Sequence, residues 1–206
     1  MTLLVVVGMA REARIVGDQA RVAIGGIGLD AAAGEPPGAI LSFGLCGGLD
    51  PALAVGDLVL GDGDAAWTAA LAAALPTKRA RFASGDEIVA TRAAKAAQRA
   101  RTGAGAADME SHLAAATAAR LGVPFAILRA VSDAAGDDLP TAAQAGFSPD
   151  GQIDIGAVLA ALSRRPGEMP ALIRTARNAG KALAALKAAW PTITRVSAPF
   201  ATGGSR

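Results

Sequence analysis

A mostly apolar segment, Phe125 to Val131, is a predicted strand that runs directly into Ser132-Asp133 and follows a predicted helix that begins near Asp108-Met109-Glu110-Ser111. A helix followed by a buried strand is typical of α/β domains, in which helices cover the faces of a mostly parallel sheet. Open α/β sheets bind ligands in the crevice outside the carboxyl ends of their strands. We therefore expect Glu110 and Asp133 to converge on one crevice, where two carboxylates suit hydroxyl recognition and acid catalysis.

Further apolar segments are predicted strands, and three of them end in glycine. Glycine allows a tight turn and lets ligand atoms approach backbone amides, which can hold anions or hydroxyls. The helix near Met109 is predicted to end at Leu121, because Gly122 and Pro124 follow it. The predicted strands are 3–7, 21–24, 39–43 and 58–60. We also expect one short helix within 62–81, a strand or turn at 83–89 that leads to another helix, and a loop at 134–152.

A chain of 206 residues, 52% of them apolar, can bury one good core, so we predict a single domain over residues 1–190. Its last helix is expected from about Pro170 to Trp190, and residues 191–206 are expected to form a flexible C-terminal tail. An apolar stripe on this helix is formed by Leu172, Ala176, Ala179, Leu183, Leu186 and Trp190. Arg174, Arg177 and Lys181 lie opposite, either as a solvated face or as a peripheral contact to anionic lipid.

Several classes of protein are disfavoured by composition. The single Cys46 excludes an intramolecular disulfide and most metal sites, and it fits a reducing compartment. No stretch of 18 consecutive apolar residues and no signal peptide is found, so we expect a cytoplasmic protein, peripheral to the inner membrane if the last helix touches lipid. A net charge of +2, without aromatic stacking partners, argues against nucleic-acid binding.

Together the motifs resemble the nucleoside phosphorylase and nucleosidase superfamily, whose purine members cleave an N-glycosidic bond. The residues that carry the resemblance are Ser42-Phe43-Gly44-Leu45-Cys46-Gly47-Gly48-Leu49-Asp50-Pro51, Val55-Gly56-Asp57, Met109-Glu110 and Ser132-Asp133. The resemblance implies a three-layer α/β/α sandwich with a central mixed β-sheet. It also implies a homodimer or larger homo-oligomer and no cofactor.

The resemblance assigns roles to four groups of residues. Asp133 would protonate the departing purine at N7, or only cap the following turn. Glu110 would accept hydrogen bonds from two ribose hydroxyls with Met109 beneath the sugar, or only complement the helix dipole together with Asp108. Ile88 and Val89 would lie near the base, where methylthioadenosine nucleosidases carry a phenylalanine at the position of Ile88.

The turn after the first strand leaves the nucleophile open between phosphate and water. Phosphorolytic relatives bind inorganic phosphate, as co-substrate, through glycines and arginine. Hydrolytic relatives position water with a glutamate, for which Glu12 is the candidate. Leu45 stands where phosphorylases often carry a hydroxyl residue. The candidate phosphate-binding residues are Gly8, Arg11, Arg14, Gly44 and Gly47.

Within the superfamily the chain looks most like the hopanoid-associated phosphorylases, which release adenine from adenosylhopane. Phosphorolysis of adenosylhopane is therefore the preferred prediction, and hydrolysis of methylthioadenosine or adenosylhomocysteine is the alternative. A catalytically silent nucleoside-binding or membrane-associated protein is the second alternative. The segment Gly26 to Ala31 also matches a dinucleotide-binding pattern, but it follows the second predicted strand and is a weak match. His112 is expected to be a helix-face residue and not a metal ligand.

Overall fold

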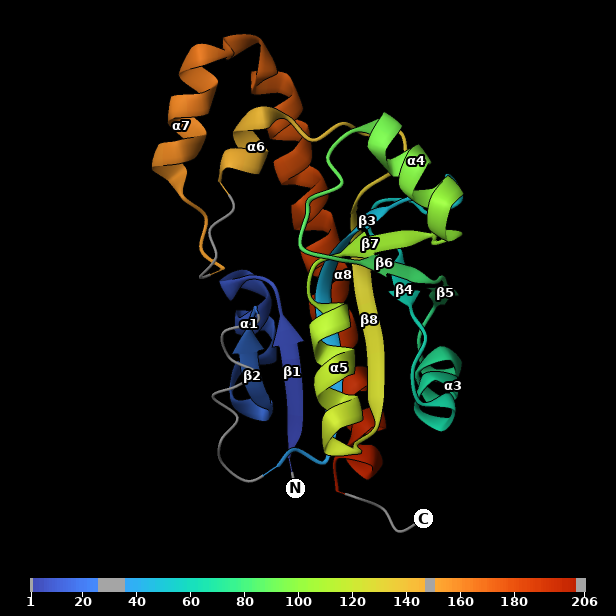
Figure 1. Cartoon of the computed structure of the whole chain (residues 1–206). Coiled ribbons are helices and arrows are strands. Elements are labelled where there is room, and N and C mark those ends of the chain that lie inside the picture. Colours follow the sequence, from blue (N-terminus) through green and yellow to red (C-terminus); the bar gives the residue numbers. More distant parts are fainter. Residues whose placement is uncertain (1, 26–35, 147–150, 203–206) are drawn as a thin grey trace.

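A mixed β-sheet forms the centre of the computed structural model, which describes residues 2–25, 36–146 and 151–202 (Figure 1). The strand order is β2-β1-β3-β8-β4-β5, and β7 joins β3 to β6 beside this path. Antiparallel pairs join β4 to β8 and β7 to β3, whereas the other pairs are parallel. The strands are β1 (Leu3–Val7), β2 (Arg21–Ile24), β3 (Ala39–Gly48), β4 (Leu58–Leu60), β5 (Thr77–Arg79), β6 (Phe82–Ser84), β7 (Ala106–Asp108) and β8 (Phe125–Asp133).

Both faces of the sheet are covered, which confirms the predicted α/β/α layers. Successive side chains of a strand point to opposite faces, so the apolar residues of β1 serve two cores. Leu3, Val5 and Val7 pack with α8 (Met169–Ala201), α3 (Ala65–Ala74) and α1 (Ala10–Val16). Leu4 and Val6 pack with α5 (Ser111–Leu121), which lies in front of the sheet in Figure 1. This two-sided burial explains the absence of polar alternation in the sequence of β1.

Strand β3 continues beyond the predicted end at Phe43 as far as Gly48. It pairs with β8 up to Cys46, and the register then shifts between Cys46 and Gly47. Beyond the shift, Gly47 and Gly48 also pair with β7. The bulge bends the strand locally, as such irregularities do next to functional sites. The carboxyl ends of β3 and β8 therefore meet β7 at one edge of the sheet.

The predicted flexible tail is wrong for residues 191–201, because α8 runs on to Ala201. Pro191 and Pro199 lie inside this helix, where proline costs about 3 kcal/mol by local propensity. Tertiary packing outweighs that cost: Ile193 and Ser197 are fully buried, and Trp67 Nε1 donates to Ser197 Oγ at 3.1 Å. Along α8 the predicted apolar stripe is buried only towards its end, at Leu186 and Trp190, whereas Ala176 is exposed.

Three other expectations of element boundaries are corrected. Asp108 ends β7 and does not lie in the helix, which begins at Ser111. The predicted loop at 134–152 contains the short helix α6 (Thr141–Ala145), and the predicted strand or turn at 83–89 overlaps β6 only to Ser84. The helix expected after this segment is α4 (Arg92–Thr102). Outside the predicted elements lie η1 (Gly17–Gln19), α7 (Ile155–Arg164) and η2 (Pro166–Glu168). Helices α6, α7 and the start of α8 rise beyond the end of the sheet (Figure 1).

Candidate active site

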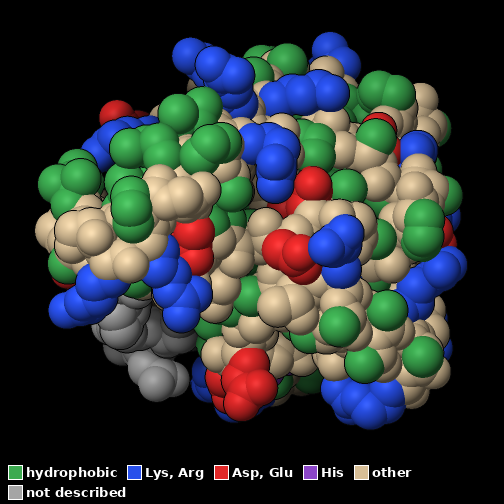
Figure 2. Space-filling view, turned by 90° about the horizontal axis from the view of Figure 1, so that it is seen from above, with side chains coloured by type: hydrophobic (Ala, Val, Ile, Leu, Met, Phe, Trp, Pro, Cys, Tyr) green, Lys and Arg blue, Asp and Glu red, His purple; other side chains and the backbone are tan. Residues whose placement is uncertain are grey.

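A cavity of about 830 Å³ lies at the carboxyl ends of β1, β3 and β8, within the usual size of small-molecule sites. Seen from this end of the molecule, acidic side chains lie near the middle of the face (Figure 2). Six carboxylates but only two basic residues line the cavity. These residues are Glu12, Asp86, Glu87, Asp108, Glu110 and Asp133, with Lys95 and Arg129.

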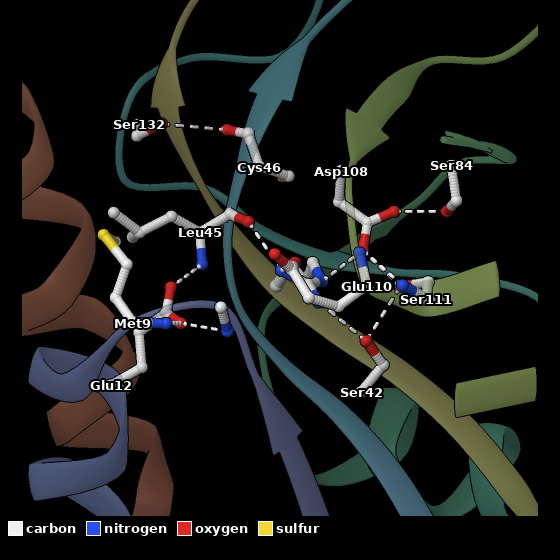
Figure 3. A network of polar contacts seen from close by, with 12 residues as sticks. Met9, Glu12, Ser42, Leu45, Cys46, Ser84, Asp108, Glu110, Ser111 and Ser132 are labelled. Atoms are coloured by element: carbon white, nitrogen blue, oxygen red, sulfur yellow. Dashed lines mark hydrogen bonds and ion pairs between the residues drawn. The ribbon is translucent and has the colours of Figure 1, made fainter. Parts of the chain in front are cut away.

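Glu12 extends from α1 into the cavity wall, and its side chain is almost completely buried. Its carboxylate accepts hydrogen bonds from the backbone N–H groups of Gly8 at 2.8 Å, Met9 at 2.9 Å and Leu45 at 2.7 Å (Figure 3). Burial raises the pKa of Glu12 from 4.5 to about 7, although Arg129 and these backbone donors oppose the rise. A carboxylate that changes its charge near neutral pH is suited to general base catalysis.

Gly44 makes room for Glu12. Its φ of 151° is one that residues with side chains rarely adopt, and a Cβ there would lie 2.5 Å from Glu12 Oε1. Gly44 therefore serves the site by its lack of a side chain, and it is not among the cavity-lining residues. Gly8 has a similar role, because a Cβ at Gly8 would lie 2.5 Å from Glu110 Oε1.

Arg129 is the central cation of the site, and sequence reasoning did not single it out. It comes from the middle of β8 and is 1% exposed. Its Nε lies 2.8 Å from Asp108 Oδ2 and its Nη1 lies 2.9 Å from Glu110 Oε2. It also donates to Leu45 O at 2.9 Å and to Ser42 Oγ at 2.8 Å. A charged residue inside an otherwise apolar strand is the sequence signal that could have identified it, since buried charges need partners.

Asp108 is a structural member of this network. Its carboxylate accepts from the backbone N–H and the hydroxyl of Ser111, at 2.8 and 2.6 Å, and from the Ser84 hydroxyl (Figure 3). Burial raises the pKa of Asp108, but the Arg129 guanidinium and these hydrogen bonds outweigh it and hold the pKa below its ordinary value. Asp108 therefore anchors the start of α5 and orients Arg129.

Asp133, the predicted acid, reaches the same cavity from the end of β8. Ser132 Oγ donates to Asp133 Oδ1 at 2.7 Å, and the Lys95 ammonium contacts Asp133 Oδ2. Lys95 was not predicted; it lies 38 residues away in sequence, on an alanine-rich helix with several other basic residues, so no local signal marks it. Gly47 borders Asp133, since a Cβ at Gly47 would lie 3.2 Å from Asp133 Oδ2.

The predicted sugar and base residues also line the cavity. Met109, 36% exposed, and Glu110 stand between β7 and α5, while Ile88 and Val89 belong to the segment before α4. Glu110 is held by Arg129 and is close to Gly8, so its carboxylate lies over the start of α1. Eight predicted site residues thus line one cavity: Gly8, Glu12, Gly47, Ile88, Val89, Met109, Glu110 and Asp133.

Arg11 and Arg14 are not brought to the site. Both are exposed, whereas Glu12 between them is buried. On a helix they point roughly 100° and 200° away from Glu12, so the three side chains of α1 cannot face one cavity. His112 also lies outside the cavity lining, with Nε2 3.4 Å from Asp86 Oδ1. The dinucleotide-like segment Gly26 to Ala31 lies outside the described residues.

A family comparison matches residues 62–164, half of the chain, to the phosphorylase superfamily. Curated protein sequences provide no match. Among solved structures, 5′-methylthioadenosine/S-adenosylhomocysteine nucleosidase from Campylobacter jejuni superposes with a TM-score of 0.60 at 18% identity, covering 91% of this chain and 99% of that one.

Two further structures have the same TM-score of 0.60. The 5′-methylthioadenosine nucleosidase of Arabidopsis thaliana is 19% identical and covers 94% of each chain. A futalosine hydrolase mutant of Helicobacter pylori is 16% identical, covering 79% of this chain and 98% of that one. At such low identity these superpositions establish the fold, an α/β domain with a mixed central sheet.

Proposed function

The chain belongs to the phosphorylase superfamily, and on this premise we propose that it cleaves the N-glycosidic bond of a 5′-substituted adenosine and releases adenine. One observation carries the proposal: Asp133, Glu110 and Glu12 reach a single cavity from three different parts of the chain. Three carboxylates there match the three tasks of the reaction, which are leaving-group protonation, ribose binding and positioning of the nucleophile.

Asp133 would protonate the base, and Glu110 would bind the sugar. Without a proton at N7, the departing purine would carry a full negative charge, and general acid assistance is worth about 10²–10⁴-fold. Glu110 can accept hydrogen bonds from two vicinal ribose hydroxyls. Met109, next to it on the cavity wall, would lie beneath the sugar, and Ile88 and Val89 would flank the base.

The charge of the cavity favours water over phosphate as the nucleophile. Six lining carboxylates would repel a phosphate dianion, and the two lining cations already have carboxylate partners, Lys95 with Asp133 and Arg129 with Asp108 and Glu110. Leu45 offers its backbone N–H to Glu12 and has no hydroxyl. Glu12 as a base for water thus becomes the preferred mechanism, and phosphorolysis, with backbone amides near Gly44 and Gly47 holding phosphate, is the alternative.

The 5′ substituent is the next part of the proposal. We prefer adenosylhopane, because of the resemblance to hopanoid-associated phosphorylases and because apolar side chains line much of the cavity. These side chains are Leu45, Leu49, Ile88, Val89, Met109, Leu113 and Leu139. Methylthioadenosine and adenosylhomocysteine, named for the structural neighbours, are the alternative substrates.

Adenine release, from adenosine with an apolar 5′ extension and from methylthioadenosine, tests the proposal when measured in phosphate and in phosphate-free buffer. We expect equal release in both buffers and a free ribose product. Release only with phosphate, yielding a ribose 1-phosphate, would establish phosphorolysis instead. Asp133→Asn should lose about 10²–10⁴-fold in turnover while retaining nucleoside binding. Binding without turnover by the wild type would favour the silent binding protein.

A peripheral membrane contact is a further part of the proposal, with a cytoplasmic location. Five of the six exposed large hydrophobic side chains among the described residues lie between residues 153 and 173: Ile153, Ile155, Leu159, Met169 and Ile173. Arg174 and Arg177 continue this surface along α8, and neither has an ion-pair partner among the described residues, whereas Lys181 lies beside Gly56. Apolar anchors flanked by arginine suit an anionic lipid surface.

Within the described ranges no helix is both long and apolar enough to cross a membrane, so any lipid contact of these helices would be peripheral. A homodimer or larger homo-oligomer is proposed from the family resemblance.

A further inference from the structure

Helix α4 packs on the body of the protein through a lysine. Lys95 is the one buried residue of α4 and is 0% exposed, while the rest of the helix is exposed or half-buried. An apolar residue is the usual choice at such a position, because burying an ammonium group costs several kcal/mol before its partners compensate. The lysine also lines the cavity described above.

The Lys95 ammonium has three donors and uses each of them at the end of β8 and in the loop that follows it. It donates to the Asp133 carboxylate, to Ala134 O at 2.8 Å and to Asp137 O at 3.0 Å. Asp133 Oδ1 is held in turn by Ser132 Oγ at 2.7 Å. Each ammonium proton of Lys95 and each carboxylate oxygen of Asp133 therefore has a hydrogen-bond partner, and Asp133 Oδ2 faces Lys95.

Stability alone does not explain this pair. Replacing a buried ion pair with apolar residues of similar size is often neutral or stabilising, so a buried pair is weak support for a structural role. An ammonium group hydrogen-bonded to a carboxylate that lines a cavity is in a position to transfer a proton to it. Both members of the pair line the cavity, and the direct contact between them suits a proton donor and its supply.

We propose that Lys95 and Asp133 form one acid, in which Lys95 supplies through Asp133 the proton that the leaving adenine takes up. The proposal rests on the proposed N-glycosidic cleavage. As the C1′–N9 bond breaks, its electron pair moves to the purine. The Asp133 carboxylate takes a proton from the Lys95 ammonium and passes it on to N7, which leaves a neutral amine and a carboxylate, and water then returns a proton to the amine. Lys95 acts through Asp133 and need not touch the nucleoside.

A nucleoside methylated at N7 separates this role from a structural one, because its base leaves as a neutral molecule without protonation. The variant Lys95→Gln keeps hydrogen-bond donors for the carbonyls of Ala134 and Asp137 but has no ammonium proton to transfer. We expect Lys95→Gln to lose about 10²–10⁴-fold in turnover of the 5′-substituted adenosine and to cleave its N7-methylated analogue nearly as fast as the wild type. Lys187→Gln, on the exposed side of α8, is the matched control and should leave both rates unchanged.

The outcomes separate two failures. Suppose that the wild type cleaves both nucleosides. If Lys95→Gln then slows cleavage of both to the same extent, or slows neither, the proton-supply role is overturned and the proposed function stands. If the wild type cleaves neither, the proposed function itself fails. Lys95→Met repeats the comparison without hydrogen-bond donors, and retained cleavage of the N7-methylated nucleoside shows directly that either variant is folded.

Discussion

Replacing Glu12 with glutamine should change how the stability of the protein depends on pH. Burial raises the pKa of Glu12 from 4.5 to about 7 in the folded state, so between these values the folded protein holds a proton that the unfolded chain has lost. The stability contributed by the neutral carboxyl is fully present below pH 4.5 and is lost as the pH rises to about 7. Glutamine is neutral over this whole pH range, so the stability of the variant does not fall in this way.

The size of the effect follows from the shift. One pKa unit corresponds to about 1.4 kcal/mol, so the move from 4.5 to about 7 amounts to about 3 kcal/mol. The side chain is almost completely buried, and solvent screening therefore reduces this figure little. The variant also loses one acceptor oxygen for the backbone donors of Gly8, Met9 and Leu45, but that cost does not depend on pH.

Urea unfolding at pH 5 and pH 8 provides the measurement. Between these values the wild type should lose about 2–3 kcal/mol more unfolding free energy than Glu12→Gln. The depressed pKa of Asp108 acts in the opposite direction, but it is present in both proteins and cancels in the difference. Glu87→Gln, at an exposed glutamate of the same cavity, should follow the wild type. A difference between wild type and Glu12→Gln that stays constant from pH 5 to pH 8 would refute the reasoning.

Two further predictions test the geometry and the surface. Gly44→Ala places a Cβ 2.5 Å from Glu12 Oε1 at a φ of 151°. We therefore expect the free energy of unfolding in urea to fall by about 1–3 kcal/mol and turnover to be lost. Gly180→Ala, with open space around it, should not destabilise α8, and equal stability of both variants would contradict the role of Gly44. In lipid flotation the protein should be retained on anionic vesicles at low salt, and it should lose this retention when Arg174, Arg177 and Lys181 become glutamine. Absence of binding at low salt, or self-association of the exposed apolar surface in place of binding, would end the membrane proposal.

Local sequence determined the strands and the two principal carboxylates. The runs at 3–7 and 58–60, and 21–24 after its first residue, are apolar without alternation because both faces of this sheet are covered. The structure confirms all three runs as strands. Glu110 and Asp133 were predicted to converge because each stands next to the end of an element, and both line one cavity. The catalytic roles remain predictions.

Tertiary structure alone decided which charged side chains reach the cavity. Glu12 turns inward while Arg11 and Arg14 turn to solvent, a choice that depends on where α1 rests on the sheet. The partners of Arg129 and Lys95 come from distant segments, such as Ser42 and Asp133. The same reason holds for α8: its last turns, beyond Pro191, are stabilised by packing against Trp67 and not by their own propensity. A buried charge or a proline in a helix is tolerated only when distant groups compensate it, and those groups meet only in the folded chain.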